Sequence, residues 1–161
     1  MTHKMLNVDD RQRIAGFYPA LLMRFWQEHA LLTLMCMMMI PFTFVTLVGL
    51  GLDHQVIIGA PAWMKPFKFA ISTFIYCLSF VYLLSFVRGH QRTTKTIGTL
   101  TALSLAVEIG LITLQVLRGT SSHFNFTTPF DNVVFGIMGG SVAVLWLAGA
   151  VLAVFLSLIH I

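Results

Sequence analysis

Several polar residues are spaced along otherwise apolar stretches so that they could form one site. Glu108 and Gln115 lie seven residues apart, which is about two turns of a helix, so their side chains share one face. Arg118 follows three residues later, and the connector after it carries His123 and Asn125. An earlier apolar stretch carries a second polar stripe at helical spacing. Its members are Lys65, Lys68, Ser72, Tyr76 and Ser79.

These residue types suit a ligand that is partly apolar and partly charged. A carboxyl group in an apolar surrounding, such as that of Glu108, could carry or relay a proton. Lys68 and Gln115 could anchor a carbonyl or carboxylate, and Arg118 could hold an anion with two parallel hydrogen bonds. His123 could act as a ligand or a hydrogen-bond partner. The full candidate set is Lys65, Lys68, Tyr76, Glu108, Gln115, Arg118, His123 and Asn125.

Each candidate also has a purely structural explanation. Glu108 could be a neutral carboxylic acid that hydrogen-bonds to Tyr76 and serves only packing, because an ionised carboxylate is costly in an apolar medium. Lys65 and Lys68 could extend to lipid headgroups. A shared cleft explains the pattern better, because two polar stripes on neighbouring helices would lie at matching depths.

A redox cofactor is one class of ligand that the sequence leaves open. Haem iron needs axial ligands such as histidine, but the six histidines, at positions 3, 29, 54, 90, 123 and 160, all lie away from the middle of the apolar stretches. His123 is the candidate metal ligand, and it would need a second ligand from His54 or another chain. A quinone or lipid needs only an apolar cleft, an aromatic wall and a few polar anchors.

The composition decides the surroundings in which these residues must act. The chain has 161 residues, of which 57% are hydrophobic and only 10% are charged, whereas soluble domains carry about 25% charged residues. So apolar a chain has too few polar side chains to coat a core in water, and its solvent must be lipid. Its net charge of +4 is then expected from positively charged flanks of spans and does not indicate nucleic-acid binding.

Four apolar stretches are each long enough to cross a bilayer, which takes about 20 helical residues. The sequence therefore predicts an all-α protein, an integral membrane four-helix bundle preceded by an amphipathic helix. Residues 1–29 form the N-terminal segment and residues 30–161 form the transmembrane domain. The predicted spans are about 30–52, 66–87, 97–117 and 133–158.

Lysine and arginine residues predict the orientation of the spans. Four lie in the N-terminal segment and three in the connector 88–96, against three on the other side. Since cytoplasmic flanks are enriched in positive charge, both termini and the connector 88–96 are predicted to be cytoplasmic. The segments 53–65 and 118–132 then face outward. The predicted location is the inner membrane of a bacterium.

The short connector predicts that the second and third spans pack as an antiparallel hairpin. Counting outward from the connector at equal rise per residue places Lys65 level with Arg118 and Lys68 level with Gln115. The same count places Glu108 level with Tyr76, near the middle of the membrane.

Two further patterns predict helix contacts. Apolar residues recur at helical spacing between residues 14 and 25, which predicts an amphipathic helix on the cytoplasmic membrane surface or beneath a partner subunit. Pro19 predicts a kink or a restart of that helix. Gly136 and Gly140 form a GxxxG pattern, which is typical of closely packed membrane helices.

Three segments resemble a family of uncharacterised bacterial multi-pass membrane proteins. They are "MKPFKFAIS", "EIGLITLQVLRGTSSHFN" and "TPFDNVVFGIMG". The resemblance covers about residues 60–150 and implies that the chain corresponds to the N-terminal half of longer proteins. It therefore implies that missing spans or another subunit complete any site. It supports treating the polar candidates as a set, but it implies no reaction.

The sequence favours a protein that binds a hydrophobic ligand or redox cofactor (quinone, haem or lipid) in an outward-facing polar cleft between the second and third spans. Whether it is an enzyme stays open. The alternative is a non-catalytic accessory subunit of a larger membrane complex, and the third possibility is a small proton-coupled transporter that dimerises. Expected partners are the lipid bilayer and either a further membrane subunit, missing spans or a second copy of the chain.

Overall fold

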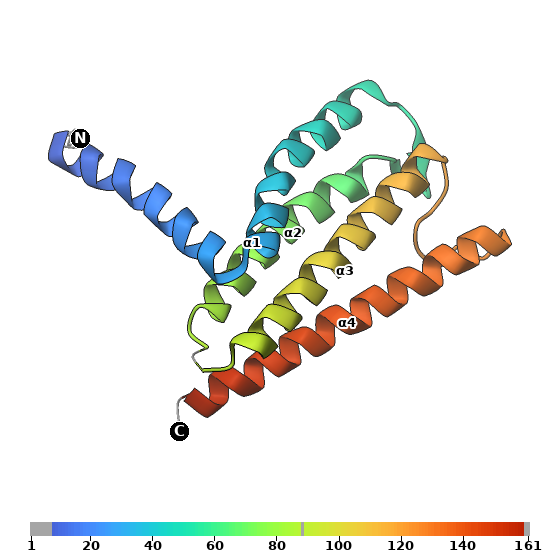
Figure 1. The fold of residues 1–161 in the computed structure, drawn as a ribbon. Coiled ribbons are helices and arrows are strands. Elements are labelled where there is room, and N and C mark those ends of the chain that lie inside the picture. The colour runs from blue at the N-terminus through green and yellow to red at the C-terminus, as the bar shows by residue number, and fades with distance from the viewer. Residues whose placement is uncertain (1–7, 88, 160–161) are drawn as a thin grey trace.

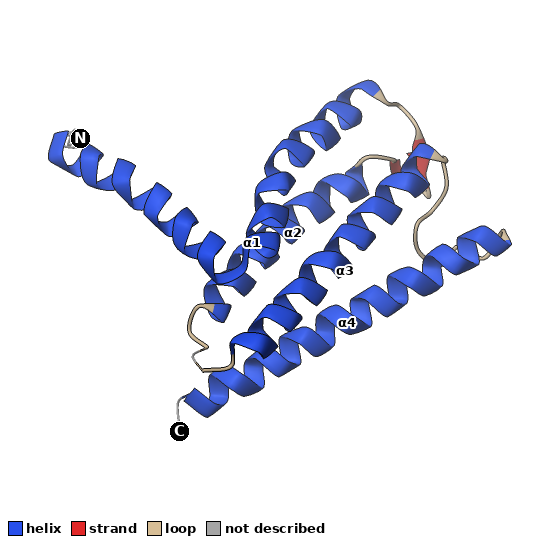
Figure 2. Ribbon diagram, viewed as in Figure 1, coloured by secondary structure: helices blue, strands red, loops and turns tan. Residues whose placement is uncertain are grey.

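The computed structural model describes the backbone of residues 8–87 and 89–159 and most of their side chains from residue 19 onward. Within these residues the chain forms long helices and one short hairpin (Figures 1 and 2). The elements are α1 (Val8–Leu52), β1 (Val56–Ile57), β2 (Ala60–Pro61), α2 (Met64–Leu84), α3 (Gln91–Leu117) and α4 (Pro129–Ile159).

The prediction of an all-α protein with four long apolar helices is confirmed. Each helix contains a segment long and apolar enough to cross a membrane. All four segments begin earlier than predicted, in part because polar residues continue the helix outward: α3 begins at Gln91 rather than 97, and α4 at Pro129 rather than 133. The four segments are Pro19–Leu52, Met64–Leu84, Gln91–Leu117 and Pro129–Leu158.

The break in α1 lies at His29, not at Pro19 as predicted. The His29 backbone is extended, with φ −156° and ψ 91°. The His29 ring caps the helix that follows: its Nδ1 accepts a hydrogen bond from the Leu32 N–H at 3.2 Å. Nε2–H donates to the Lys95 carbonyl of α3 at 3.0 Å. The part of α1 before His29, called the arm below, leaves the bundle at a steep angle (Figure 1).

The arm carries the stripe that the sequence predicts to be amphipathic. The side chains of Ile14, Phe17 and Tyr18 lie outside the described residues. Of the remainder, Phe25 is buried at the break while Leu22 is exposed. The last turn of the arm therefore packs against the bundle, and the rest of the stripe stays a prediction.

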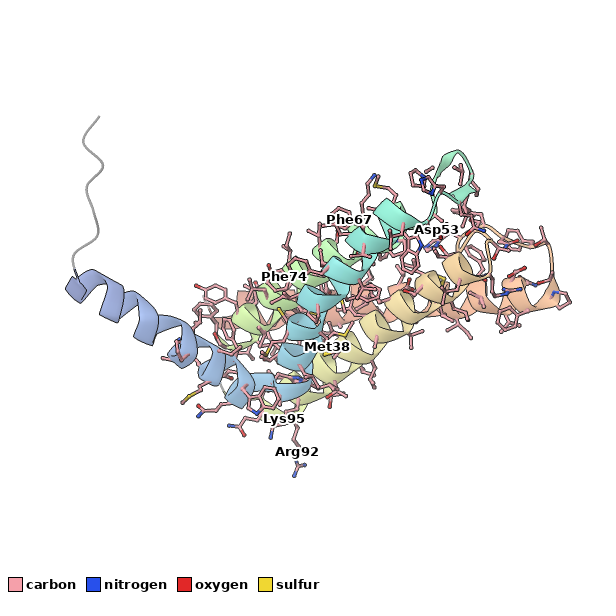
Figure 3. The ribbon with its side chains drawn as sticks, turned by 90° about the horizontal axis from the view of Figure 1, so that it is seen from above. Met38, Asp53, Phe67, Phe74, Arg92 and Lys95 are labelled. Carbon is pink, nitrogen blue, oxygen red and sulfur yellow. The ribbon has the colours of Figure 1, made fainter. Side chains whose placement is uncertain are left out.

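The bundle packs α1 on α2 and on α3, α2 on α3, and α3 on α4. Its core is apolar, and the free cysteines Cys36 and Cys77 are both buried in it. Figure 3 shows Asp53 at one end of the bundle and Lys95 towards the other. We call the first the hairpin end, because β1 and β2 lie there together with the start of α2, the end of α3 and the connector 118–128.

The GxxxG pattern of α4 does not make the predicted contact within the chain. A methyl group added at Gly136, Gly139 or Gly140 would meet no atom of the described chain within 4 Å. The helix packs through one narrow face that includes Met138 and Ala148, while Trp146 on another face is 73% exposed. The glycine face of α4 is therefore open to whatever surrounds the bundle.

Candidate functional site

A pocket of about 340 Å³ opens at the hairpin end. Apolar side chains from three elements form most of its wall, including Ile57 of β1, Phe69 of α2 and Val116 of α3. Its polar lining residues come from α2 and from the connector after α3. They are Lys65, Lys68, Thr120, Ser121 and Ser122.

Lys65 is held in place by the connector that follows α3. Its ammonium group donates to the Ser122 hydroxyl and lies 2.7 Å from Nδ1 of His123. Burial, and then the Lys65 charge, lower the pKa of His123 below its ordinary value. His123 is therefore neutral at pH 7, with Nδ1 accepting from Lys65 and the proton on Nε2. Lys68, one turn along α2, is exposed and lines the same pocket.

The wall formed by the hairpin is fixed by a short hydrogen-bonded clip. The Asp53 carboxylate accepts from the Trp63 indole N–H at 2.8 Å and from the Gln55 backbone N–H at 2.9 Å. These bonds lower the pKa of Asp53. The Trp63 ring lies against Gly49, where no larger residue would fit. The turn between β1 and β2 has positive φ at Ile58 and Gly59, which is the backbone form of a tight two-residue hairpin.

Arg118 and Gln115 do not face the pocket with the lysines. Asp131, at the start of α4, is 1% exposed and accepts from Arg118 at 2.6 Å and from Gln115 at 2.9 Å. Arg118 also donates to the Gln115 side-chain oxygen and stacks over the Phe130 ring at 4.4 Å. Arg118 is predicted to lie level with Lys65, but its guanidinium turns towards the buried acid of α4.

Asp131 is the residue that sequence reasoning missed. Thr128 caps α4: its hydroxyl accepts from the Asp131 N–H at 3.1 Å and donates to the Asp131 carboxylate at 2.6 Å. Pro129 occupies the first position of the helix, where its missing N–H costs nothing. The run Thr-x-x-Asp ahead of an apolar stretch is the signal that predicts this arrangement.

Asn125 is used entirely within the connector. Its amide donates to the Ser121 carbonyl and its oxygen accepts from the backbone and hydroxyl of Thr127. Phe124, with φ +53°, is forced into the left-handed region, and its exposed ring packs on Phe135 of α4. The connector thus closes one side of the pocket with its serines and turns its aromatic residues towards α4.

Glu108 lies apart from this pocket, in the middle of α3. It is 2% exposed, and within the described part of the chain neither carboxyl oxygen has a hydrogen-bond partner. The hydrogen bond to Tyr76 that a packing role predicts is not formed, although both residues line one small pocket of about 170 Å³. That shared pocket agrees with the predicted register of the two helices.

The polar stripe of α2 turns into the bundle only in part, with Lys65 and Tyr76 half-buried. Lys68, Ser72 and Ser79 are exposed, because the face that α2 buries consists of smaller or apolar residues such as Ala70, Cys77 and Val81. The lysines line one pocket and Glu108 lines another, and Phe69 belongs to the walls of both.

Comparison of the chain with protein-family models, curated proteins and solved structures found no match. Among residues 8–87 and 89–159, no group of three or more His, Cys, Asp or Glu side chains is placed to hold a metal ion. The functional evidence therefore lies in the pocket at the hairpin end and in the pocket beside Glu108.

Proposed function

We propose that this is a multi-pass membrane protein that binds an anionic amphiphile in the pocket at the hairpin end. The observation that carries the proposal is the mixed lining of that pocket. Most of its wall is apolar, and two lysines, Lys65 and Lys68, line it as well. A ligand with an acyl chain and a carboxylate or phosphate head matches both parts of the lining.

The two lysines have different parts in this proposal. Lys65 is already oriented by Ser122 and His123, so little side-chain freedom is lost when it pairs with an anion. Lys68 is exposed and can close on the head group from the solvent side. Hydrogen bonds between ionised partners are about twice as strong as neutral ones, and here they lie beside apolar residues that limit competition from water.

Quinone and haem fit this pocket less well than an anionic amphiphile. A quinone head is uncharged and would leave two ammonium groups without a counter-charge. The Nδ1 atom of His123 already faces Lys65, so an iron ligand would have to come from Nε2. An anionic lipid uses every polar group on the pocket wall without disturbing these contacts.

The membrane setting belongs to the same proposal. The four helices supply the apolar surface, and the excess of lysine and arginine near the opposite end favours that end in the cytoplasm. The pocket would then open near the outer leaflet of a bacterial inner membrane. The resemblance to uncharacterised bacterial multi-pass proteins is compatible with this setting and adds no activity to it.

Binding of a fluorescent fatty acid, compared with the matching fatty alcohol, tests the proposal. We expect the detergent-solubilised protein to prefer the acid, and Lys65→Met to weaken binding of the acid by about tenfold, as expected for loss of one charge-assisted hydrogen bond of about 1.5 kcal/mol. Lys95→Met, at the opposite end, is the matched control and should bind normally. Phosphatidic acid as a competitor distinguishes a phosphate from a carboxylate head. Equal binding of acid and alcohol would refute the proposal.

A second candidate function, an accessory subunit of a membrane complex, is favoured by the open glycine face of α4. Small residues there allow the helix of another subunit to approach closely, and the chain itself does not use them. Native mass spectrometry of gently solubilised membranes tests this function. A stable partner that is lost in Gly140→Leu supports it, whereas an isolated chain loaded with lipid favours the first.

A further inference from the structure

Glu108 is a buried acid that has no hydrogen-bond partner among the residues that the structure describes. Its side chain is 2% exposed, and both oxygens lack hydrogen bonds within the described residues. Burying an unpaired polar group costs free energy, and burying an unpaired charge costs much more. An acid kept in this state is therefore neutral when the pocket beside it is empty, and one O–H donor and two acceptor oxygens are free to bind a ligand.

The pocket beside Glu108 is formed by three helices. Phe69, Ser72 and Tyr76 come from α2, Leu105 and Glu108 from α3, and Val142 and Leu145 from α4. Most of its surface is apolar, and the hydroxyl groups of Ser72 and Tyr76 join the carboxyl group as polar neighbours. The volume of about 170 Å³ accommodates a head group but not a whole lipid.

This pocket is distinct from the one at the hairpin end. Phe69 lines both pockets, whereas Lys65 and Lys68 line only the hairpin-end pocket and Glu108 lines only the smaller one. Ser72, which lines this pocket, is exposed near the middle of α2. Its neighbours Ile71 and Ile75 make the surface there apolar, so a ligand would reach the pocket beside Glu108 from the lipid.

We propose that Glu108 binds the oxygen-bearing head of an uncharged lipophile, such as a long-chain alcohol or a quinone, that enters laterally from the membrane between α2 and α4. The protonated carboxyl group donates to a carbonyl or hydroxyl oxygen of the ligand, and its second oxygen accepts from a hydroxyl group. The Tyr76 hydroxyl offers a further hydrogen bond. The tail of the ligand lies along the exposed apolar side chains of the bundle. This site is additional to the proposed function and does not depend on it.

The reaction of Glu108 with dicyclohexylcarbodiimide tests the proposal on the protein without a mutation. The carboxyl oxygen bonds to the central carbon of the reagent while the carboxyl proton moves to its nitrogen. The acyl group then shifts from oxygen to nitrogen and gives a stable N-acylurea, so that no atom is lost and no further reactant is needed. The reagent is apolar and should reach a lipid-facing acid, whereas a water-soluble charged carbodiimide should not.

We expect mass spectrometry of the membrane-reconstituted protein to locate the adduct at Glu108 and to find none there in Glu108→Gln. Saturating oleyl alcohol or decyl-benzoquinone should slow labelling by about tenfold, as expected for about 90% occupancy of the pocket. The two probes distinguish a hydroxyl head from a carbonyl head. Lys68→Met, which weakens only the hairpin-end pocket, should leave labelling and protection unchanged.

Three outcomes would overturn the proposal. Absence of labelling at Glu108 would mean that lipid-soluble molecules do not reach it. Equal labelling by the water-soluble reagent would mean that the pocket opens to water. Labelling that neither uncharged lipophile slows would mean that the pocket holds no such head group. Glu108 has no hydrogen-bond partner among the described residues, so Glu108→Gln breaks no such bond there. This variant is therefore expected to fold, and its thermal unfolding midpoint checks this.

Discussion

Asp131 and Glu108 are both almost fully buried acids, and the protein surrounds them in opposite ways. Asp131 accepts hydrogen bonds from Arg118, Gln115, Thr127 and Thr128. Glu108, 2% exposed, accepts none within the described residues. The first lies where two helices and a connector meet, and the second lies in the middle of a helix beside a pocket. Burial alone therefore does not tell what a buried acid does.

The difference separates groups that hold the structure from groups that are free to bind. Asp131 joins α3 to α4 and also accepts from Thr128, the residue that caps α4, so its carboxylate is used within the chain. Glu108 contributes no such bond, and the cost of burying it is not offset within the chain. A protein retains such a group where something else completes it.

The largest effect is expected from a mutation that breaks the hydrogen bonds around Asp131. Gln115→Leu removes the amide that donates to Asp131 and accepts from Arg118 and Thr120. Because the partners stay buried and lose these bonds, we expect a loss of about 1–3 kcal/mol in the free energy of unfolding. Reversible denaturation in detergent measures it. Gln91→Leu, the same change at an exposed position of the same helix, is the control. An unchanged stability of Gln115→Leu would show that the network does not hold the helices together.

A smaller effect on the free energy of unfolding, of opposite sign, is expected from a mutation at Glu108. Glu108→Leu replaces an unpaired buried carboxyl group with an apolar side chain of similar length. We expect it to raise the free energy of unfolding by about 1 kcal/mol, measured in the same way. Glu108→Gln keeps a buried polar group and should gain little. Destabilisation by Glu108→Leu would mean that the carboxyl group has a structural partner after all, and the contrast with Asp131 would fail.

The smallest expected effect concerns pH and the connector beside Lys65. The pKa of His123 is lower in the folded protein than its ordinary value of 6.5, so the unfolded chain takes up the proton first as the pH falls. The contribution of His123 to stability is therefore complete above about pH 6.5 and declines below it. Thermal unfolding midpoints at several pH values should show a slope that His123→Gln reduces and that His90→Gln, a change at an exposed site, does not. An equal slope in both variants would contradict this assignment.

Much of the fold could be predicted from the sequence, because the apolar stretches and their lengths carry the information. The sequence predicts the span of α3 to begin after its polar start, because Gln91, Arg92 and Lys95 are hydrophilic. The helix itself nevertheless begins at Gln91, since a helix readily extends beyond the apolar region. The break in α1 could not be located from Pro19, because it depends on a contact between His29 and Lys95 that is distant in the sequence.

The site was predicted only in part, for a reason visible in two residues. Spacing correctly placed Glu108 and Tyr76 at one level, since helix geometry fixes the level of a side chain. It could not show which way Arg118 turns, because the guanidinium follows the charge of Asp131, and that acid comes from a helix whose position the α2–α3 hairpin does not determine.

The contact of His29 with the Lys95 carbonyl has a consequence for how the arm meets a membrane. A surface helix ordinarily settles at the depth at which its apolar and charged faces balance. Here the root of the arm is held against α3 by the hydrogen bond from the His29 ring to the Lys95 carbonyl and by the close fit of that ring against Gly98. The position of that root relative to the bundle is therefore set by contacts within the chain.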